Sequence, residues 1–288
     1  MTTAAGADRW AIPPLFSRLV NDTSLLQPRA TGPAVDAVVA RYLTARDGRR
    51  GELFGQLVCP VSRLPELVGE LAKAAPARPV ELSLVVDTGL GAVPKALSTV
   101  FSRPSLLIVR TIETPAPPDV DAIWLDRVSE FVPEDVVAVV EPRRPHGVDP
   151  AGTASWLEAV RRVAEHGCAP KLRCGGPRDS DVPSTVDVAG FVRVAVQTGR
   201  EFTVLGLREV IRTDTCHGIL NLLVAVSRAL TDGDVRAALE STDATALAEE
   251  ALGLSAEAVT AVRGLLARCG AEPGPQPSDD LVGLGLLS

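Results

Sequence analysis

Short runs of Val and Leu alternate along the chain with longer stretches in which apolar residues recur at helical spacing. The longer stretches, such as 62–75, 154–165 and 184–197, have the 3.6-residue period of helices that bury one face. Such alternation predicts βαβ units and a parallel sheet. The short runs are predicted strands: 53–58, 82–86, 106–109, 136–140, 171–173 and 202–205.

The pattern is less regular outside these units. Residues 10–20 are expected to form a short helix, 21–32 a loop and 34–45 a helix. Residues 122–125 fit either an extra strand or the first turn of a helix. The apolar tail 281–287 is expected to dock on the domain or to add a last strand. Beyond Cys216 the chain is predicted to be helical, at about 217–230, 233–240, 243–251 and 255–268.

The order of these elements predicts an α/β fold, a (β/α) barrel related to the TIM barrel, with extra C-terminal helices. It would occupy residues 21–269 as one domain, between an N-terminal extension (1–20) and a Pro/Gly-rich tail (270–288). Only six strands are clear, so closure by seven or eight is inferred. The alternative is an open doubly wound sheet, which an exposed sheet edge would reveal.

Composition narrows the function classes. The formal net charge is -7 and aromatic residues make up 3% of the chain, so a nucleic-acid or anionic-membrane surface is not expected. No signal peptide and no apolar run of membrane-spanning length is apparent, which favours the cytoplasm. The five cysteines are odd in number and form no CxxC pair, so free thiols are expected. Homo-oligomerisation is left open.

The predicted strands end in ionisable side chains. Asp87, Arg110 and Glu141 follow the second, third and fourth predicted strands, and Lys171 and Arg173 belong to the fifth. Ligands of parallel α/β folds bind at the carboxyl ends of the strands. These groups are therefore candidates for one site. A helix cap or loop turn is an equal alternative for Asp87.

The fifth strand and the turn after it form the most suggestive stretch, 170–176. Lys171 and Arg173 lie two residues apart, so they point to the same face of a strand. Gly175 and Gly176 allow a sharp turn and close approach of a ligand. The chain has only three lysines against many arginines, so Lys171 is a candidate amine in its own right. A structural ion-pair network is the competing interpretation.

A second candidate segment precedes the first C-terminal helix. His217 is expected in the first turn, capped by Asp214 or Thr215, where the helix dipole favours a neutral imidazole. Asn221 lies one turn further on the same face. Both would orient a substrate carbonyl or a water. Alternatively, His217 bonds a backbone carbonyl and Asn221 holds a loop.

Several signatures are missing from the sequence. There is no P-loop, no complete dinucleotide fingerprint, no HExxH and no GxSxG. The three histidines are not at metal-ligand spacing, so neither a metal nor a cofactor is expected. Cys174, beside Arg173, would be reactive if its pKa were lowered, although inert packing is the commoner role of such a cysteine.

These motifs resemble those of a family of uncharacterised bacterial proteins from high-GC genomes. The matching segments are Lys171–Gly176 (Lys-x-Arg-x-Gly-Gly), 183–184, 206–207 and His217–Asn221 (His-Gly-x-Leu-Asn). The resemblance implies a barrel-like α/β fold. This chain departs from the family pattern at two places. It has Phe202-Thr203-Val204 where relatives carry a second lysine, and Arg208-Glu209 where they carry a histidine pair. The lysine on a late strand is also similar, at fold level, to class I aldolases with a Schiff-base lysine.

Two functions are consistent with these features. The first is an enzyme acting on a small carboxylated or phosphorylated metabolite, most plausibly an aldolase-type lyase. Lys171 would be its nucleophile or an electrostatic partner, and Glu141 or Asp87 would move protons. The anion would be held by Arg110, Arg173 and the amides of Gly175 and Gly176. The second is a non-catalytic ligand-binding or scaffold barrel.

Overall fold

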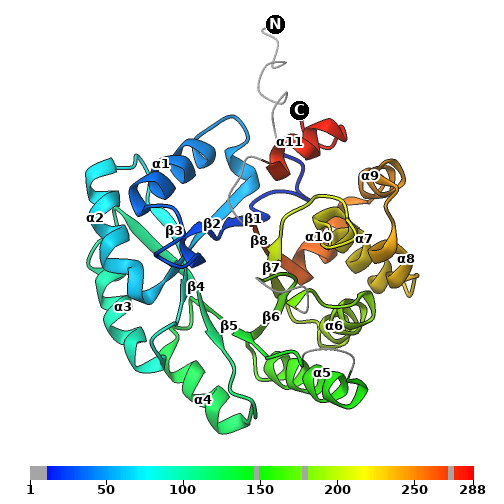
Figure 1. Ribbon diagram of the computed structural model, residues 1–288, viewed down its shortest axis with the longest axis horizontal. Helices are drawn as coiled ribbons and strands as arrows, with labels where there is room; N and C mark the ends of the chain where they lie inside the picture. The colour runs from blue at the N-terminus through cyan, green and yellow to red at the C-terminus, as the bar shows by residue number, and fades with distance from the viewer. Residues whose placement is uncertain (1–11, 146–148, 177–180, 272–275) are drawn as a thin grey trace, which may run out of the picture.

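A computed structural model describes residues 12–145, 149–176, 181–271 and 276–288. Over these residues the chain forms a closed barrel of eight parallel strands in sequence order (Figure 1). β1 (Val20–Asp22) pairs with β8 (Leu266–Ala271), with Val20 opposite Cys269, and this pairing closes the sheet. A closed sheet has no free edge, so the fold is a (β/α) barrel of the TIM-barrel type and not an open doubly wound sheet.

Six further strands lie between β1 and β8, and helices alternate with them. These strands are β2 (Phe54–Pro60), β3 (Val80–Val85), β4 (Leu107–Pro115), β5 (Val137–Glu141), β6 (Ala169–Arg173) and β7 (Phe202–Leu207). The helices that follow β1 to β6 are α1 (Val35–Arg46), α2 (Leu64–Ala74), α3 (Val93–Phe101), α4 (Ala122–Phe131), α5 (Pro150–Glu165) and α6 (Thr185–Thr198).

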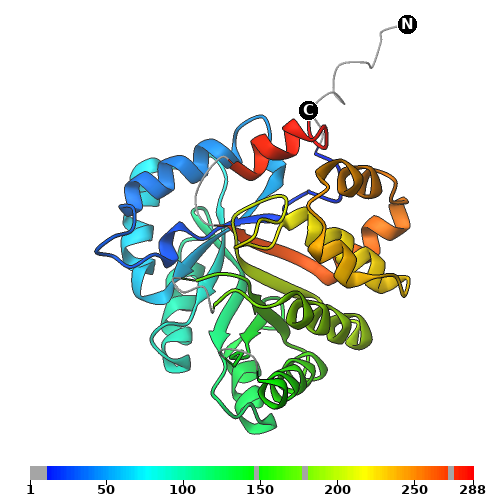
Figure 2. The ribbon, with the colours of Figure 1, turned by 45° about the vertical axis from the view of Figure 1, so that its right-hand side comes forward.

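The last quarter of the barrel carries the extra helices. Four of them connect β7 to β8, where a regular unit has one, and they stand together on one side of the barrel (Figures 1 and 2). The C-terminal α11 (Gln276–Gly283) follows β8, and Leu281, Leu286 and Leu287 are buried, so the apolar tail docks as expected. The four connecting helices are α7 (Ile219–Leu230), α8 (Val235–Glu240), α9 (Ala244–Leu252) and α10 (Ala256–Leu265).

Two of the eight strands fall where the sequence pattern predicts something else. β1 spans the end of the expected helix 10–20 and the start of the expected loop 21–32, and it was missed because it has only three residues, of which Asn21 is polar although buried. β8 overlaps the end of the expected helix 255–268, since α10 ends at Leu265 and β8 begins at the next residue, Leu266, with no loop between them. The expected helix 10–20 is wrong over its described part, where residues 14–18 form turns.

The third predicted strand is longer than 106–109. β4 continues to Pro115, and Arg110 is the extra residue of a bulge, because Leu82 pairs with Val109 and Ser83 with Thr111. A bulge leaves one residue without a partner and re-aims the side chains around it. Thr111 and Glu113 consequently belong to the barrel interior. The ambiguous segment 122–125 is the start of α4, with Asp121 as its N-cap.

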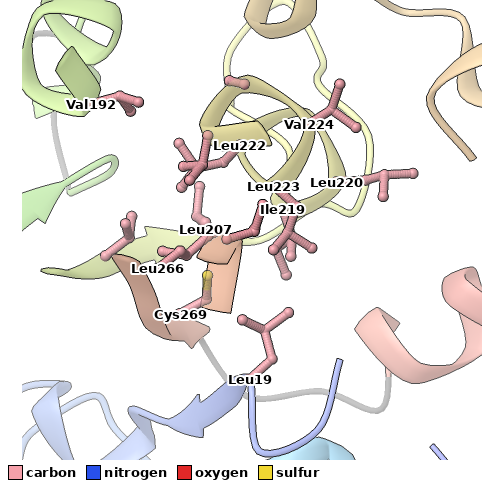
Figure 3. Close-up of a cluster of buried hydrophobic side chains, with 14 of the residues drawn as sticks. Leu19, Val192, Leu207, Ile219, Leu220, Leu222, Leu223, Val224, Leu266 and Cys269 are labelled. Carbon is pink, nitrogen blue, oxygen red and sulfur yellow. The ribbon is translucent and has the colours of Figure 1, made fainter. Parts of the chain in front are cut away.

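The hydrophobic core lies between the barrel and its outer helices. Figure 3 shows part of it, where Ile219, Leu222 and Leu223 of α7 gather near Leu207 and Leu266 of β7 and β8. All five of these side chains are buried. Burial of each stabilises the fold by about 1.5–3 kcal/mol. This core fixes the outside of the strands, while their inner faces carry a different set of residues.

Candidate active site inside the barrel

Polar side chains occupy much of the barrel interior. TIM barrels normally fill this space with Val, Ile and Leu. Apart from Thr114 on β4, the buried polar residues on the strands form two hydrogen-bonded groups and a threonine between them. They are Asn21, Gln56, Ser83, Thr111, Glu113, Lys171 and Thr203.

The first group is built around a buried ion pair between Lys171 of β6 and Glu113 of β4. Lys171 Nζ donates to Glu113 Oε2 at 2.5 Å, and the two side chains are only 6% and 8% exposed. Ser83 Oγ donates to the other carboxylate oxygen, Oε1. Glu113 therefore accepts a hydrogen bond at each oxygen, which compensates the cost of burying a charge.

Glu141 lies at the end of β5 between two cations. Its Oε2 is 3.6 Å from Lys171 Nζ, and the Arg173 guanidinium donates to its two oxygens at 2.6 and 3.0 Å. Burial alone would raise the pKa of Glu141, but the charges of Lys171 and Arg173 outweigh it and lower that pKa. Desolvation opposes the charge on Arg173, but the bonds to Glu141 raise the pKa of Arg173. Glu113, Lys171, Glu141 and Arg173 thus form one ionic chain.

The second group lies on β1, β2 and β4. Asn21 Nδ2 and Thr111 Oγ1 both donate to Gln56 Oε1, at 3.2 and 3.0 Å. The Gln56 backbone N–H in turn donates to Asn21 Oδ1 at 2.8 Å. These bonds link the inner faces of three strands.

The two glycines after β6 have different surroundings. A Cβ on Gly175 would lie 2.7 Å from the Gly206 carbonyl oxygen, and Gly206 itself has φ +89° at a bulge of β7. Close approach of two backbones explains Gly175. A Cβ on Gly176 would meet the Asp181 carboxylate, at 2.4 Å from Oδ2. A carboxylate beside Gly176 disfavours an anion at its amide.

Asp87 and Arg110 lie apart from the ionic chain. Asp87 is exposed after β3, where its carboxylate accepts bonds from the Ser62 amide (3.0 Å) and the Ser62 hydroxyl. It joins two loops, the alternative role considered for it. Arg110 is also exposed and donates to Glu81 at 3.1 Å, near the start of β3. The expectation that Arg110 ends a strand is wrong, because the bulge places it in the first half of β4.

His217 and Asn221 hydrogen-bond to backbone groups around the start of α7. The helix begins at Ile219 with Gly218 as its N-cap, so His217 precedes the first turn that was expected to contain it. His217 Nε2 donates to the Pro183 carbonyl at 2.7 Å, and burial lowers the pKa of this histidine. Asn221 accepts from the Arg212 amide and donates to the carbonyls of Ala238 and Ser241. These bonds match the alternative in which His217 bonds a backbone carbonyl and Asn221 holds a loop.

The cysteines offer no reactive thiolate near the ionic chain. All five are free, as expected. Burial raises the pKa of the Cys174 thiol, so the proposal of a lowered value is wrong. Among the described residues no group of three His, Cys, Asp or Glu side chains is arranged to hold a metal ion. None of the described helices has the length and apolar character of a membrane span.

Two cavities lie in this part of the molecule, and only the smaller one is lined by residues of the ionic chain. One of about 570 Å³ lies outside the barrel, between α1, β1 and α11, with Tyr42 and Phe54 in its wall. Two of its arginines are already paired, Arg41 with Asp22 and Arg50 with Asp279. The other, inside the barrel, is about 10 Å³ and is lined by Glu113, Lys171 and Thr203 among others. Its volume suits about one water molecule beside the lysine.

Glu113 is the main residue that motif reasoning missed. A signal for it exists in the sequence, because β-branched residues continue past Arg110 at Thr111, Ile112 and Thr114. Alternation along that run places Thr111 and Glu113 on one face. The charged Arg110 obscured this pattern, since an arginine inside an apolar run resembles the end of a strand.

No protein-family model matches this chain. No curated protein matches its sequence either.

Proposed function

We propose that the protein is an aldolase-type lyase that acts on a small anionic carbonyl compound, with Lys171 as the amine. The fold is compatible with an enzyme of this kind. The observation that carries the proposal is the buried Lys171–Glu113 pair at 2.5 Å on the inner face of the barrel. Hydrophobic residues of similar volume often stabilise a core as well as a buried ion pair does, so stability alone is a weak reason for this pair.

The pair supplies the two groups that imine formation needs. Transfer of one ammonium proton from Lys171 to Glu113 produces a neutral amine and a carboxylic acid in contact. The amine nitrogen attacks the substrate carbonyl carbon, and the resulting carbinolamine loses its hydroxyl as water after protonation by the acid. Glu113 is better suited to this exchange than Glu141, because both oxygens of Glu141 accept bonds from Arg173 and its pKa is lowered.

Carbon–carbon cleavage follows from the iminium ion. A carboxylate removes the proton of the β-hydroxyl group, the bond between the α and β carbons breaks, and its electron pair enters the iminium as an enamine. An aldehyde leaves. The enamine takes a proton at the α carbon, and water hydrolyses the imine to regenerate Lys171. The half-exposed guanidinium of Arg173 is the cation that would meet the carboxylate or phosphate of the substrate.

A non-catalytic binding barrel is the second candidate, and one observation favours it. Lys171 is ion-paired with Glu113 and lies 3.6 Å from Glu141, whereas attack on a carbonyl requires a neutral amine. In that case the ionic chain would hold an anion through Arg173 without bond formation. The two functions differ in whether a covalent adduct forms.

Borohydride trapping separates them. Wild type and Lys171→Arg are incubated with a panel of keto acids, ketose phosphates and aldehydes, reduced with borohydride, and examined by intact mass. We expect wild type to gain the mass of one reduced imine with a subset of the panel, and Lys171→Arg to gain none. Binding of the same compounds to wild type without any trapped mass would support the binding barrel instead.

A further inference from the structure

A third cavity enters the barrel from the end where the strands begin. It has a volume of about 410 Å³ and its wall includes Val137 and Ala169, the first residues of β5 and β6. It extends inward to Thr203 and Arg268. Small-molecule sites commonly have volumes of about 300–1,000 Å³. The barrel therefore has space for a ligand at the end opposite Glu141 and Arg173.

Small side chains create this space. Ala169, Thr111 and Ala267 line the cavity. Branched aliphatic residues would normally close a barrel at these depths. Val137 and Val139 add apolar wall on β5, so the cavity combines an apolar side with a polar inner end.

Two buried polar atoms at the inner end have no partner among the described residues. They are the Thr203 hydroxyl oxygen and Arg268 Nε. Thr203 is 9% exposed and lies opposite Arg268 in the pairing of β7 with β8, and both residues line this cavity. Buried donors are nearly always hydrogen-bonded, and two unsatisfied donors on residues that line one cavity point to a missing acceptor.

Three arginines and three carboxylates line this cavity: Arg18, Arg110, Arg268, Glu81, Asp135 and Glu201. Burial lowers the pKa of Arg268, as does the positive charge of Arg18, while Glu201 opposes the shift. At the rim Glu81 is already paired, with Arg18 and with Arg110. Arg268 Nη1 bonds to the Ala267 carbonyl at 2.7 Å. Within the part of the chain that the structure describes, Arg268 lacks a carboxylate partner at ion-pair distance.

We propose that this cavity binds a small aliphatic carboxylate. One carboxylate oxygen accepts from the Thr203 hydroxyl and the other from Arg268 Nε, and the aliphatic part lies along Val137, Val139 and Ala169. Two donors on adjacent strands match the two oxygens of a carboxylate, whereas a phosphate would require more positive charge than one arginine. The cavity opens at the opposite end of the barrel from Arg173. Thr203 and Arg268 also line the small cavity beside Lys171, but the lyase proposal gives neither of them a role, so this proposal does not depend on it.

The test is a titration with propionate, using calorimetry and ligand-observed NMR on the full chain. Propionamide, which lacks the charge, is the ligand control. Thr203→Val removes the hydroxyl with little change of shape, and Thr203→Ser retains it. Thr114→Val is the matched control, because Thr114 is a buried threonine on β4 whose hydroxyl donates to the Pro115 carbonyl instead.

We expect wild type, Thr203→Ser and Thr114→Val to bind propionate with similar affinity and propionamide far more weakly. Thr203→Val should lose at least about tenfold in affinity, equivalent to about 1.4 kcal/mol, without a lower Tm. Absence of propionate binding to wild type would overturn the proposal, and so would equal binding by Thr203→Val. Either negative result leaves trapping at Lys171 unaffected, so the two proposals fail separately.

Discussion

Lys171 Nζ on β6 donates a 2.5 Å hydrogen bond to Glu113 Oε2 on β4, across the interior and past the intervening strand β5. The residue in register with Lys171 on β7 is Thr203, whose hydroxyl has no partner among the described residues. The barrel thus places an ion-paired lysine beside an unsatisfied hydroxyl.

The effects of Lys171 and Glu113 on the free energy of unfolding should be strongly coupled. Lys171→Met leaves the Glu113 carboxylate buried without its cation, and we expect the free energy of unfolding to fall by about 3–5 kcal/mol. The double variant Lys171→Met/Glu113→Gln removes both charges and keeps an acceptor for Ser83, so it should recover most of that loss. Urea denaturation of the two variants measures both values. A neutral effect of Lys171→Met alone would contradict the buried pair.

Two threonines of the interior should respond in opposite directions. Thr203→Val removes a hydroxyl that lacks a partner, so stability should stay unchanged or rise by about 1–2 kcal/mol. Thr111→Val removes a bond to Gln56 and should cost about 0.5–1.5 kcal/mol. The comparison uses chemical denaturation at one pH. A larger loss for Thr203→Val than for Thr111→Val would show that the Thr203 hydroxyl is satisfied in solution.

His217 should give the stability a pH dependence below its ordinary pKa of 6.5. Burial lowers the folded-state pKa, so the unfolded chain takes up the proton at higher pH than the folded protein. The stability that neutral His217 contributes is complete above about pH 6.5, and it declines as the pH falls toward the lower pKa of His217 in the folded protein. His217→Gln, which keeps a donor for the Pro183 carbonyl, should flatten the curve in that range. Denaturation midpoints measured at several pH values test this, and an unchanged slope in the variant would contradict it.

Replacement of Gly206 by alanine should destabilise the protein far more than the same replacement of Gly199, a glycine at a helix end. A Cβ at Gly206 would lie 2.8 Å from the Gly175 nitrogen, and φ is +89°. Gly199, the C-cap of α6, has φ +62° but open space around it. Gly199→Ala should cost about 1–2 kcal/mol, the cost of its backbone conformation. Gly206→Ala should cost clearly more, and similar losses in the two variants would argue against the close contact of Gly206 with Gly175.

Much of the barrel follows from the sequence pattern, since the six predicted strands and the helices between them are present. The two missed strands have physical reasons. β1 has three residues, one of them the inward-facing Asn21, and β8 continues directly from the end of α10. Neither offers the run of apolar residues by which a short strand is usually recognised.

The site was harder to predict, because it depends on which strand residues face inward. Glu141, Lys171 and Arg173 come together as the strand-end pattern suggests. Arg110 does not, because a one-residue bulge determines where its side chain points and leaves no local mark in the sequence. Glu113 emerges only once β4 is extended through that bulge.

If Lys171 reacts as an amine, the distribution of a borohydride-trapped adduct over the lysines of the chain will show it. The chain has only three, and Lys73 and Lys95 are exposed controls. After trapping with the carbonyl compounds that label wild type, peptide mass spectrometry should find the reduced adduct on Lys171 and little on the other two. Glu113→Gln should reduce labelling of Lys171 without changing that of Lys73 or Lys95. Labelling confined to the exposed lysines, or insensitive to Glu113, would contradict the account.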